Sequence, residues 1–132
     1  AFLEYQFQFY ENTVKRRRQI ADIYHNHLLD ISEIILPPKP TENNRNFDVF
    51  QNYEIEAENR NKLQSYLFEN EIGTLIQWGG KGVHQFSALG FNKVLPFSEN
   101  IFDRMLLLPI NMSITNNEVE FVCNTIKSFY KR

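Results

Sequence analysis

The sequence predicts a small α+β domain, in which a small antiparallel sheet of about three strands is flanked by helices. Its 132 residues fit one domain, and its 12 Phe, 6 Tyr and 1 Trp require a packed core to bury them. The spacing of apolar residues changes along the chain from a helical period to alternation and back. The resulting order is helix, strand, helix, strand, helix, strand, helix, which is typical of an α+β domain with a sheet of this size.

Residues 1–30 contain neither glycine nor proline and predict one long helix. Such a helix would be about 45 Å long, roughly twice the width of a core of this size. The first ten residues also carry aromatic side chains on more than one face. We therefore expect this end to bury itself against protein outside the sequence; a helix lying wholly inside the domain is the alternative. The apolar positions in helical register are Leu3, Phe7, Tyr10, Val14, Ala21, Tyr24, Leu28 and Ile31.

Three prolines between positions 37 and 40 end this helical region. Apolar and acidic residues then alternate over 47–57, which predicts a half-buried strand. Leucine and tyrosine at helical spacing over 60–70 predict a short helix, which Ile72 and Gly73 close. A second strand is expected over 74–78.

The C-terminal half predicts two further helices and the third strand. A helical turn is expected around residues 83–89, and Ser98 is the expected N-cap of a helix near 99–104. An apolar strand over 105–109 follows. Thr115 and Glu118 form a capping-box pattern at the start of the last helix, because each side chain can satisfy a free backbone N–H group. The apolar stripe of that helix consists of Val119, Val122, Ile126 and Phe129.

Charge and composition exclude several classes of function. Fourteen basic and sixteen acidic residues give a net charge of −2, which provides no overall attraction to nucleic acid or anionic lipid. The basic run at 15–18 points around the whole circumference of a helix and forms no single basic face. The one cysteine, Cys123, excludes an internal disulfide and favours a reducing, cytoplasmic location. No stretch predicts a membrane span or a signal peptide, and a chain beginning with Ala1 is expected to be a piece of a longer protein.

No metal site and no catalytic triad is predicted. His25 and His27 are two residues apart on a predicted helix and therefore face different directions, whereas ligand pairs on a helix need a spacing of three or four. His84 has no ligand-spaced partner in the sequence. Cys123 lies on a helix without a nearby histidine, so we expect it to be a small buried residue.

One segment, residues 74–85, combines the features of a binding site. A strand is expected to deliver its polar and aromatic residues to a loop with three glycines, which allows close approach of the backbone to a ligand. Backbone N–H groups in such a loop can bind an anion, Lys81 adds a charge, and Trp78 offers a flat surface for a sugar or a base. The alternative is a surface turn followed by a hydrogen-bonded histidine. The candidate binding residues are Gln77, Trp78, Gly79, Gly80, Lys81, His84 and Gln85.

A series of motifs along the chain resembles the C-terminal small domain of the pyridoxal-phosphate-dependent sugar aminotransferases of the DegT/DnrJ/EryC1/StrS family. Residues 16–24 resemble the helix that links the large and small domains of that family, and residues 60–74 resemble its arginine-led helix followed by an Ile-Gly pair and a threonine. His84 corresponds to the second histidine of the His-Tyr-Pro…His segment. The remaining matches are Leu89-Gly90-Phe91, Pro96, Ser98-Glu99, Leu107-Leu108-Pro109 and Thr115.

The candidate loop departs from the family pattern. Gln77, Trp78 and Gly79 replace the usual His-Tyr-Pro, and Gly82 replaces a second proline, so the loop has a different binding face and more backbone freedom. This version of the loop is similar to that of enzymes acting on dTDP-linked 3-keto-6-deoxyhexoses.

The resemblance implies the small domain of a fold-type I aminotransferase. In that family a large domain carries the lysine that forms a Schiff base with pyridoxal phosphate, and an amino group, usually from glutamate, passes to a keto sugar nucleotide. None of the seven lysines matches that position. We therefore expect residues 1–132 to be one small domain without a catalytic residue, and inactive alone. Residues 1–30 would link it to an N-terminal large domain, in a protein that acts as a homodimer.

Two other interpretations stay open. A non-catalytic α+β module could bind a partner protein or a nucleotide sugar without chemistry. A single-stranded nucleic-acid binder would need a basic face beside Trp78 and Phe86, where the sequence supplies only Lys81 and Lys93.

Overall fold

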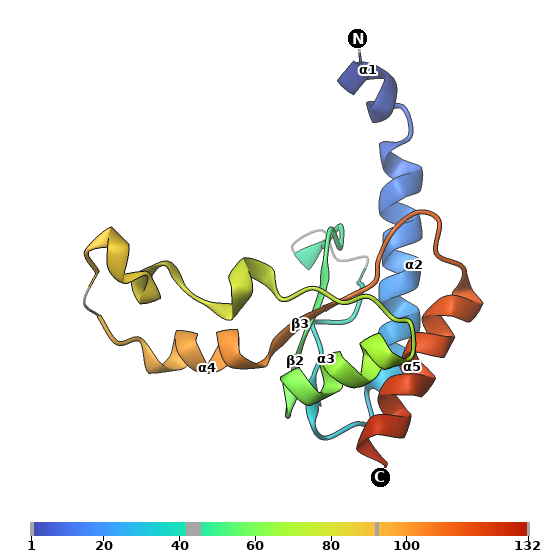
Figure 1. Cartoon of the computed structure of the whole chain (residues 1–132). Coiled ribbons are helices and arrows are strands. Elements are labelled where there is room, and N and C mark those ends of the chain that lie inside the picture. The colour runs from blue at the N-terminus through green and yellow to red at the C-terminus, as the bar shows by residue number, and fades with distance from the viewer. Residues whose placement is uncertain (1, 42–45, 92, 132) are drawn as a thin grey trace.

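A three-stranded antiparallel sheet organises the computed structural model, which describes residues 2–41, 46–91 and 93–131 (Figure 1). The strands are β1 (Ile34–Ile35), β2 (Tyr53–Ala57) and β3 (Met105–Leu108), in the order β1-β2-β3. Ile55 pairs with Leu106, and Ile34 pairs with Ala57. The predicted α+β class is confirmed.

Three helices pack on the apolar face of this sheet: α2 (Tyr10–Leu28), α3 (Arg60–Glu69) and α5 (Asn116–Tyr130). Alternation in β2 sends Tyr53, Ile55 and Ala57 into the core and leaves two glutamates half-buried on the other face. The ring of Tyr24 from α2 stacks on Tyr53 at 4.8 Å between centroids. The core therefore lies between one sheet face and three helices.

The predicted strands are only partly confirmed. The prediction of a strand over 105–109 is confirmed by β3, but the strand predicted over 47–57 begins only at Tyr53. The strand predicted over 74–78 is wrong, because only Leu75 pairs there, through two hydrogen bonds with Leu107 on the free edge of β3. The third strand is instead β1, a two-residue strand that is too short to show a period.

The predicted helix over 1–30 is two helices, and Ala1 lies outside the described residues. Helix α1 (Phe2–Phe7) has no buried residue, and α2 begins at Tyr10. Between them the backbone forms tighter bonds three residues apart, from Gln8 N–H to Tyr5 C=O and from Phe9 N–H to Gln6 C=O. No glycine or proline marks this break, so periodicity cannot predict it. Helix α1 extends beyond the sheet, away from the body of the domain (Figure 1).

Residues 74–104 leave the sheet edge as an arm and return to it (Figure 1). The outward half contains three short 3₁₀ turns, η2 (Gln77–Gly80), η3 (Val83–Gln85) and η4 (Ser87–Leu89), and the return is α4 (Pro96–Arg104). The helical turn expected around 83–89 is thus confirmed. The prediction of Ser98 as N-cap is wrong: Pro96 occupies the first turn and Leu95 is the N-cap residue, because proline suits a position that needs no N–H donor.

The last helix follows its sequence signals. Thr115 Oγ1 accepts from Glu118 N–H at 3.3 Å, and Glu118 Oε2 accepts from Thr115 N–H at 2.7 Å, so the capping box is confirmed. Val119, Val122 and Ile126 are buried and Phe129 is half-buried. Among the described residues, no helix combines the length and the apolar character needed to cross a membrane.

Candidate functional site

The glycine-rich loop lies near the base of the arm, directly after Leu75 joins the sheet. Trp78, Gly79 and Gly80 all have left-handed backbone conformations, with φ of +55°, +65° and +71°. Glycine adopts this region freely, but tryptophan does so at a cost of order 1 kcal/mol. The tryptophan side chain is 74% exposed. The backbone thus turns a large aromatic side chain outward into solvent.

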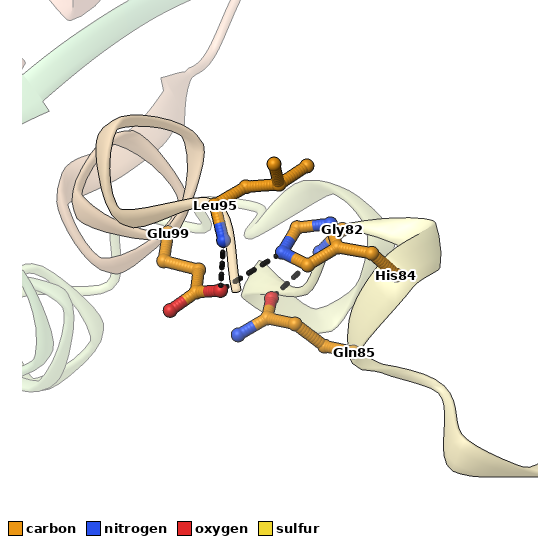
Figure 2. Close-up of polar contacts among 5 residues, drawn as sticks. All are labelled: Gly82, His84, Gln85, Leu95 and Glu99. Atoms are coloured by element: carbon orange, nitrogen blue, oxygen red, sulfur yellow. Dashed lines mark hydrogen bonds and ion pairs between the residues drawn. The ribbon is translucent and has the colours of Figure 1, made fainter. Parts of the chain in front are cut away.

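His84 is held by an acidic residue that the sequence spacing does not reveal. Its Nε2 lies 3.0 Å from Oε1 of Glu99, on the first turns of α4, and the same oxygen accepts from Leu95 N–H at 2.9 Å (Figure 2). The side chain of His84 is only 11% exposed. The pair therefore joins the outward half of the arm to its returning helix.

The glutamate of this pair is held in its ionised form. Hydrogen bonds from Leu95 N–H, and next from His84, lower the pKa of Glu99 below its ordinary value. A carboxylate can only accept, so Nε2 of His84 carries the proton in this contact. The other ring nitrogen, Nδ1, faces Gly82.

Gly82 and Gln85 complete the surroundings of the imidazole. A Cβ atom built on Gly82 would lie 2.7 Å from Cε1 of His84 and 2.8 Å from Cε2 of Phe102, so only glycine fits beside the ring. Gly82 N–H donates to Oε1 of Gln85 at 2.9 Å (Figure 2). This bond takes one backbone N–H group out of any anion-binding arrangement of the loop.

The predicted site residues form two groups. His84 and Gln85 come together with Gly82 through the contacts above. Exposed Trp78 and Lys81 flank Gly79 and Gly80 in the turn, and Gln77 is half-buried at its start. Among the described residues, no hydrogen bond or ion pair links Trp78 or Lys81 to His84.

Two residues of this region were missed by the sequence interpretation. Glu99 follows His84 by fifteen positions, and the return of the arm brings them together; Arg60 opens α3 and reaches the glycine turn. Spacing along one helix or strand gives no signal for either, because both contacts depend on tertiary structure. Both residues lie in stretches that resemble the family, but the resemblance gives neither of them a contact partner.

The lysines of the chain do not fit a Schiff-base site for pyridoxal phosphate. Lys127 on α5 is half-buried and the other six are exposed, so none has the enclosed surroundings that activate a lysine nucleophile. Within the described ranges, no three His, Cys, Asp or Glu side chains come together as a metal-binding group. Cys123 is buried, as expected, and burial raises the pKa of its thiol to about 12.

A sequence model of the DegT/DnrJ/EryC1/StrS aminotransferase family matches residues 1–127. The chain is 27% identical over 135 aligned residues to the pleiotropic regulatory protein of Geobacillus stearothermophilus, covering 99% of the chain and 36% of that protein. It is 27% identical over 111 residues to dTDP-4-dehydro-2,3,6-trideoxy-D-glucose 4-aminotransferase of Saccharopolyspora spinosa, covering 84% of the chain and 28% of that protein.

The fold is similar to part of a solved DegT DnrJ EryC1 StrS aminotransferase from Brucella abortus. The TM-score is 0.84 at 25% identity, and the match covers 98% of the chain and 34% of that structure. The chain thus spans about a third of the length of the relatives it matches.

Proposed function

The chain belongs to the DegT/DnrJ/EryC1/StrS aminotransferase family, and from this membership we propose that it is the C-terminal small domain of a nucleotide-sugar aminotransferase. The match over residues 1–127 carries the proposal. The family is pyridoxal-phosphate-dependent, and the lysines here do not fit a Schiff base. The cofactor and its lysine therefore belong to a large domain outside these 132 residues, and the chain alone is inactive.

The substrate we propose is a dTDP-linked keto-deoxyhexose, with glutamate as the amino donor. The named activity of the Saccharopolyspora spinosa relative supports a dTDP-dehydro sugar and an amino group placed at carbon 4. The Gln-Trp-Gly loop resembles that of enzymes for 3-keto-6-deoxyhexoses. Both keto positions are therefore included in the test below, and the expected product is an amino deoxysugar nucleotide made in the cytoplasm.

The glycine loop is the proposed substrate-facing element of this domain. Exposed Trp78 provides a flat surface for a sugar ring or a base, and Lys81 provides a positive charge for a phosphate. Gly79 and Gly80 let the backbone approach a ligand, and the side-chain amide of Gln77 can donate and accept hydrogen bonds at the start of the turn. His84 and Gln85 act on the neighbouring side, where their mutual contacts with Gly82 limit their freedom.

The proposed partners are the large domain and a second copy of the full-length protein. Exposed apolar side chains of α1 support the first of these contacts, since Phe2, Leu3 and Phe7 are each more than 70% exposed. Burial against the large domain removes this surface from water. The homodimer is proposed from family membership.

The test is addition of pyridoxal phosphate and glutamate to the full-length protein, followed by keto sugar nucleotides. The expected result is a change in cofactor absorbance with glutamate that reverses on adding the correct dTDP-keto sugar. Arms with 3-keto and 4-keto substrates distinguish the two positions. Absence of any cofactor absorbance band would reject the enzyme.

A regulatory module is the second candidate function. The Geobacillus stearothermophilus relative is named as a pleiotropic regulatory protein, although the family is one of aminotransferases. In that case the same loop binds a nucleotide sugar or a partner protein without chemistry. Tight binding of a dTDP-sugar by full-length protein that does not transaminate would favour this function.

A further inference from the structure

The side chain of Arg60 turns away from its own helix. Arg60 is the first residue of α3, at the positive end of the helix dipole, and the first turn of α3 has no acidic residue. Yet its side chain is buried, with only 8% of the residue exposed. A buried arginine at an unfavourable helix end needs a compensating environment elsewhere.

That environment is the end of the returning helix of the arm. The guanidinium donates from Nη2 to Phe102 C=O at 3.4 Å and from Nη1 to Met105 C=O at 3.5 Å. Phe102 lies in the last turn of α4, and Met105 is its C-cap residue. The carbonyl groups at a helix C-terminus carry partial negative charge, so the arginine stabilises this end through its charge as well as through two long hydrogen bonds.

The same guanidinium also packs against the glycine turn, residues Gln77–Gly80. A Cβ atom built on Gly80 would lie 3.3 Å from Nη2 of Arg60, and also 3.3 Å from Phe102 C=O and from Cγ2 of Ile76. Gly80 therefore packs closely on the arginine and on the end of α4. Arg60 thus contacts both the outgoing segment of the arm, at Gly80, and its returning segment, at the end of α4.

We propose that Arg60 is the positioning residue of the Gln77–Gly80 turn: its guanidinium fixes the turn against the C-terminus of α4 and so sets the direction of Trp78. This role rests on the proposed function, in which the turn faces the substrate. Arg60 itself contacts main-chain atoms and has no part in the chemistry. The planar guanidinium donates to two carbonyl groups and packs against Gly80 at the same time, which the single ammonium group of lysine cannot do.

The test measures the order of the turn independently of catalysis, in the full-length protein. Hydrogen exchange of a peptide covering residues 77–82 is compared between wild type and Arg60→Lys. We expect exchange in this peptide to rise roughly tenfold, while peptides from α5 exchange as in wild type. Arg60→Met keeps the length of the side chain but removes its charge and its donors, and it is expected to give the same local rise, which keeps the test decisive if Arg60→Lys does not fold.

The matched control is Arg104→Lys. Arg104 lies on the same helix end and pairs with Glu56 at 3.7 Å, on the other face of β2. This control is expected to leave exchange of residues 77–82 unchanged. Wild-type exchange of the turn in Arg60→Lys or in Arg60→Met, or an equal rise in Arg104→Lys, would overturn the proposed positioning.

Kinetics of the same variants separate this proposal from the proposed function. Arg60→Lys is expected to raise KM for the keto sugar about five- to tenfold with kcat within about twofold, because a disordered binding surface loses ground-state and transition-state binding alike. Increased exchange of the turn with unchanged KM would uphold the link between Arg60 and the turn but reject the turn as the substrate-facing element.

Discussion

The imidazole of His84 is enclosed on several sides, whereas Trp78, six residues earlier, is free in solvent. Oε1 of Glu99 accepts a hydrogen bond from Nε2, and Gly82 fits closely between the imidazole and the ring of Phe102. The Trp78 side chain is 74% exposed, and its backbone is held in a left-handed conformation. The His84 side chain is thus packed within the arm, whereas the Trp78 side chain projects from it into solvent.

Alanine substitutions at these two positions are therefore expected to behave differently in the full-length protein. Trp78→Ala removes an exposed stacking surface, so kcat/KM for the keto sugar falls roughly ten- to a hundredfold, equivalent to about 1–3 kcal/mol, with an unchanged melting temperature. His84→Ala also lowers the melting temperature, because Glu99 and Gly82 lose their contacts. Both quantities are measured on each variant. Normal kinetics for Trp78→Ala would mean that the glycine loop is only a turn.

The lowered pKa of Glu99 makes one contribution to stability depend on pH. A carboxyl group with a lower pKa in the folded state stabilises the fold above its ordinary pKa, and this stabilisation is lost as the pH falls through the folded-state value. Glu99→Gln keeps the side-chain shape and removes the charge. The difference in unfolding free energy between wild type and Glu99→Gln is expected to be largest above the ordinary pKa of glutamate, about 4.3, and to shrink as the pH falls below it.

Chemical denaturation at a series of pH values measures this difference. Glu120→Gln, on the exposed face of α5, is the control and is expected to change stability little at any pH. A difference for Glu99→Gln that is constant from pH 7 to pH 2 would contradict the assigned ionised pair.

Helix α5 depends on its first turn for a stable start, since Thr115 and Glu118 satisfy backbone groups at each other's position. Thr115→Ala is expected to lower the unfolding free energy by about 1 kcal/mol, because the N–H of Glu118 loses its acceptor. Ser128→Ala removes a hydroxyl from the same helix that only donates to Asn124 C=O, and serves as the matched control with an effect below about 0.5 kcal/mol. Urea unfolding measures both, and equal effects would argue against the capping box as the cause.

The elements that the sequence predicts well are those whose signals are local. The capping box and apolar stripe of α5 lie within one helix, and the alternation of β2 is visible over the five residues that form the strand. The strand predicted over 74–78 is wrong because the pairing of Leu75 with Leu107 ends after one bridge, and no local sequence pattern indicates where such a pairing ends. The site shows the same division. Its glycines and Trp78 are evident in the sequence, whereas Glu99 and Arg60 reach it only through the return of the arm.

The molecule consists of a well-packed body with two apolar projections. The body contains the sheet, α2, α3 and α5, while α1 and the arm extend away from it (Figure 1). Large side chains on both projections are exposed to an extent that is unusual for a self-contained domain. On the arm they include Leu75, Trp78, Val83, Leu89, Val94 and Phe97. This distribution supports a domain that completes its packing, and its proposed substrate site, against protein outside these residues.

The surroundings of the lysines predict how the 132-residue chain responds to pyridoxal phosphate. The six exposed lysines lack the enclosed surroundings that activate a lysine nucleophile, and the half-buried Lys127 lies on α5, which packs on α2 and α3. Incubation with the cofactor followed by borohydride reduction is therefore expected to give only scattered, substoichiometric adducts by mass spectrometry. Full-length protein, as the control, is expected to give one stoichiometric adduct that maps outside residues 1–132. A stoichiometric adduct on Lys81 in the 132-residue chain would contradict the assignment of the cofactor to the large domain, and would make the glycine loop itself the site of chemistry.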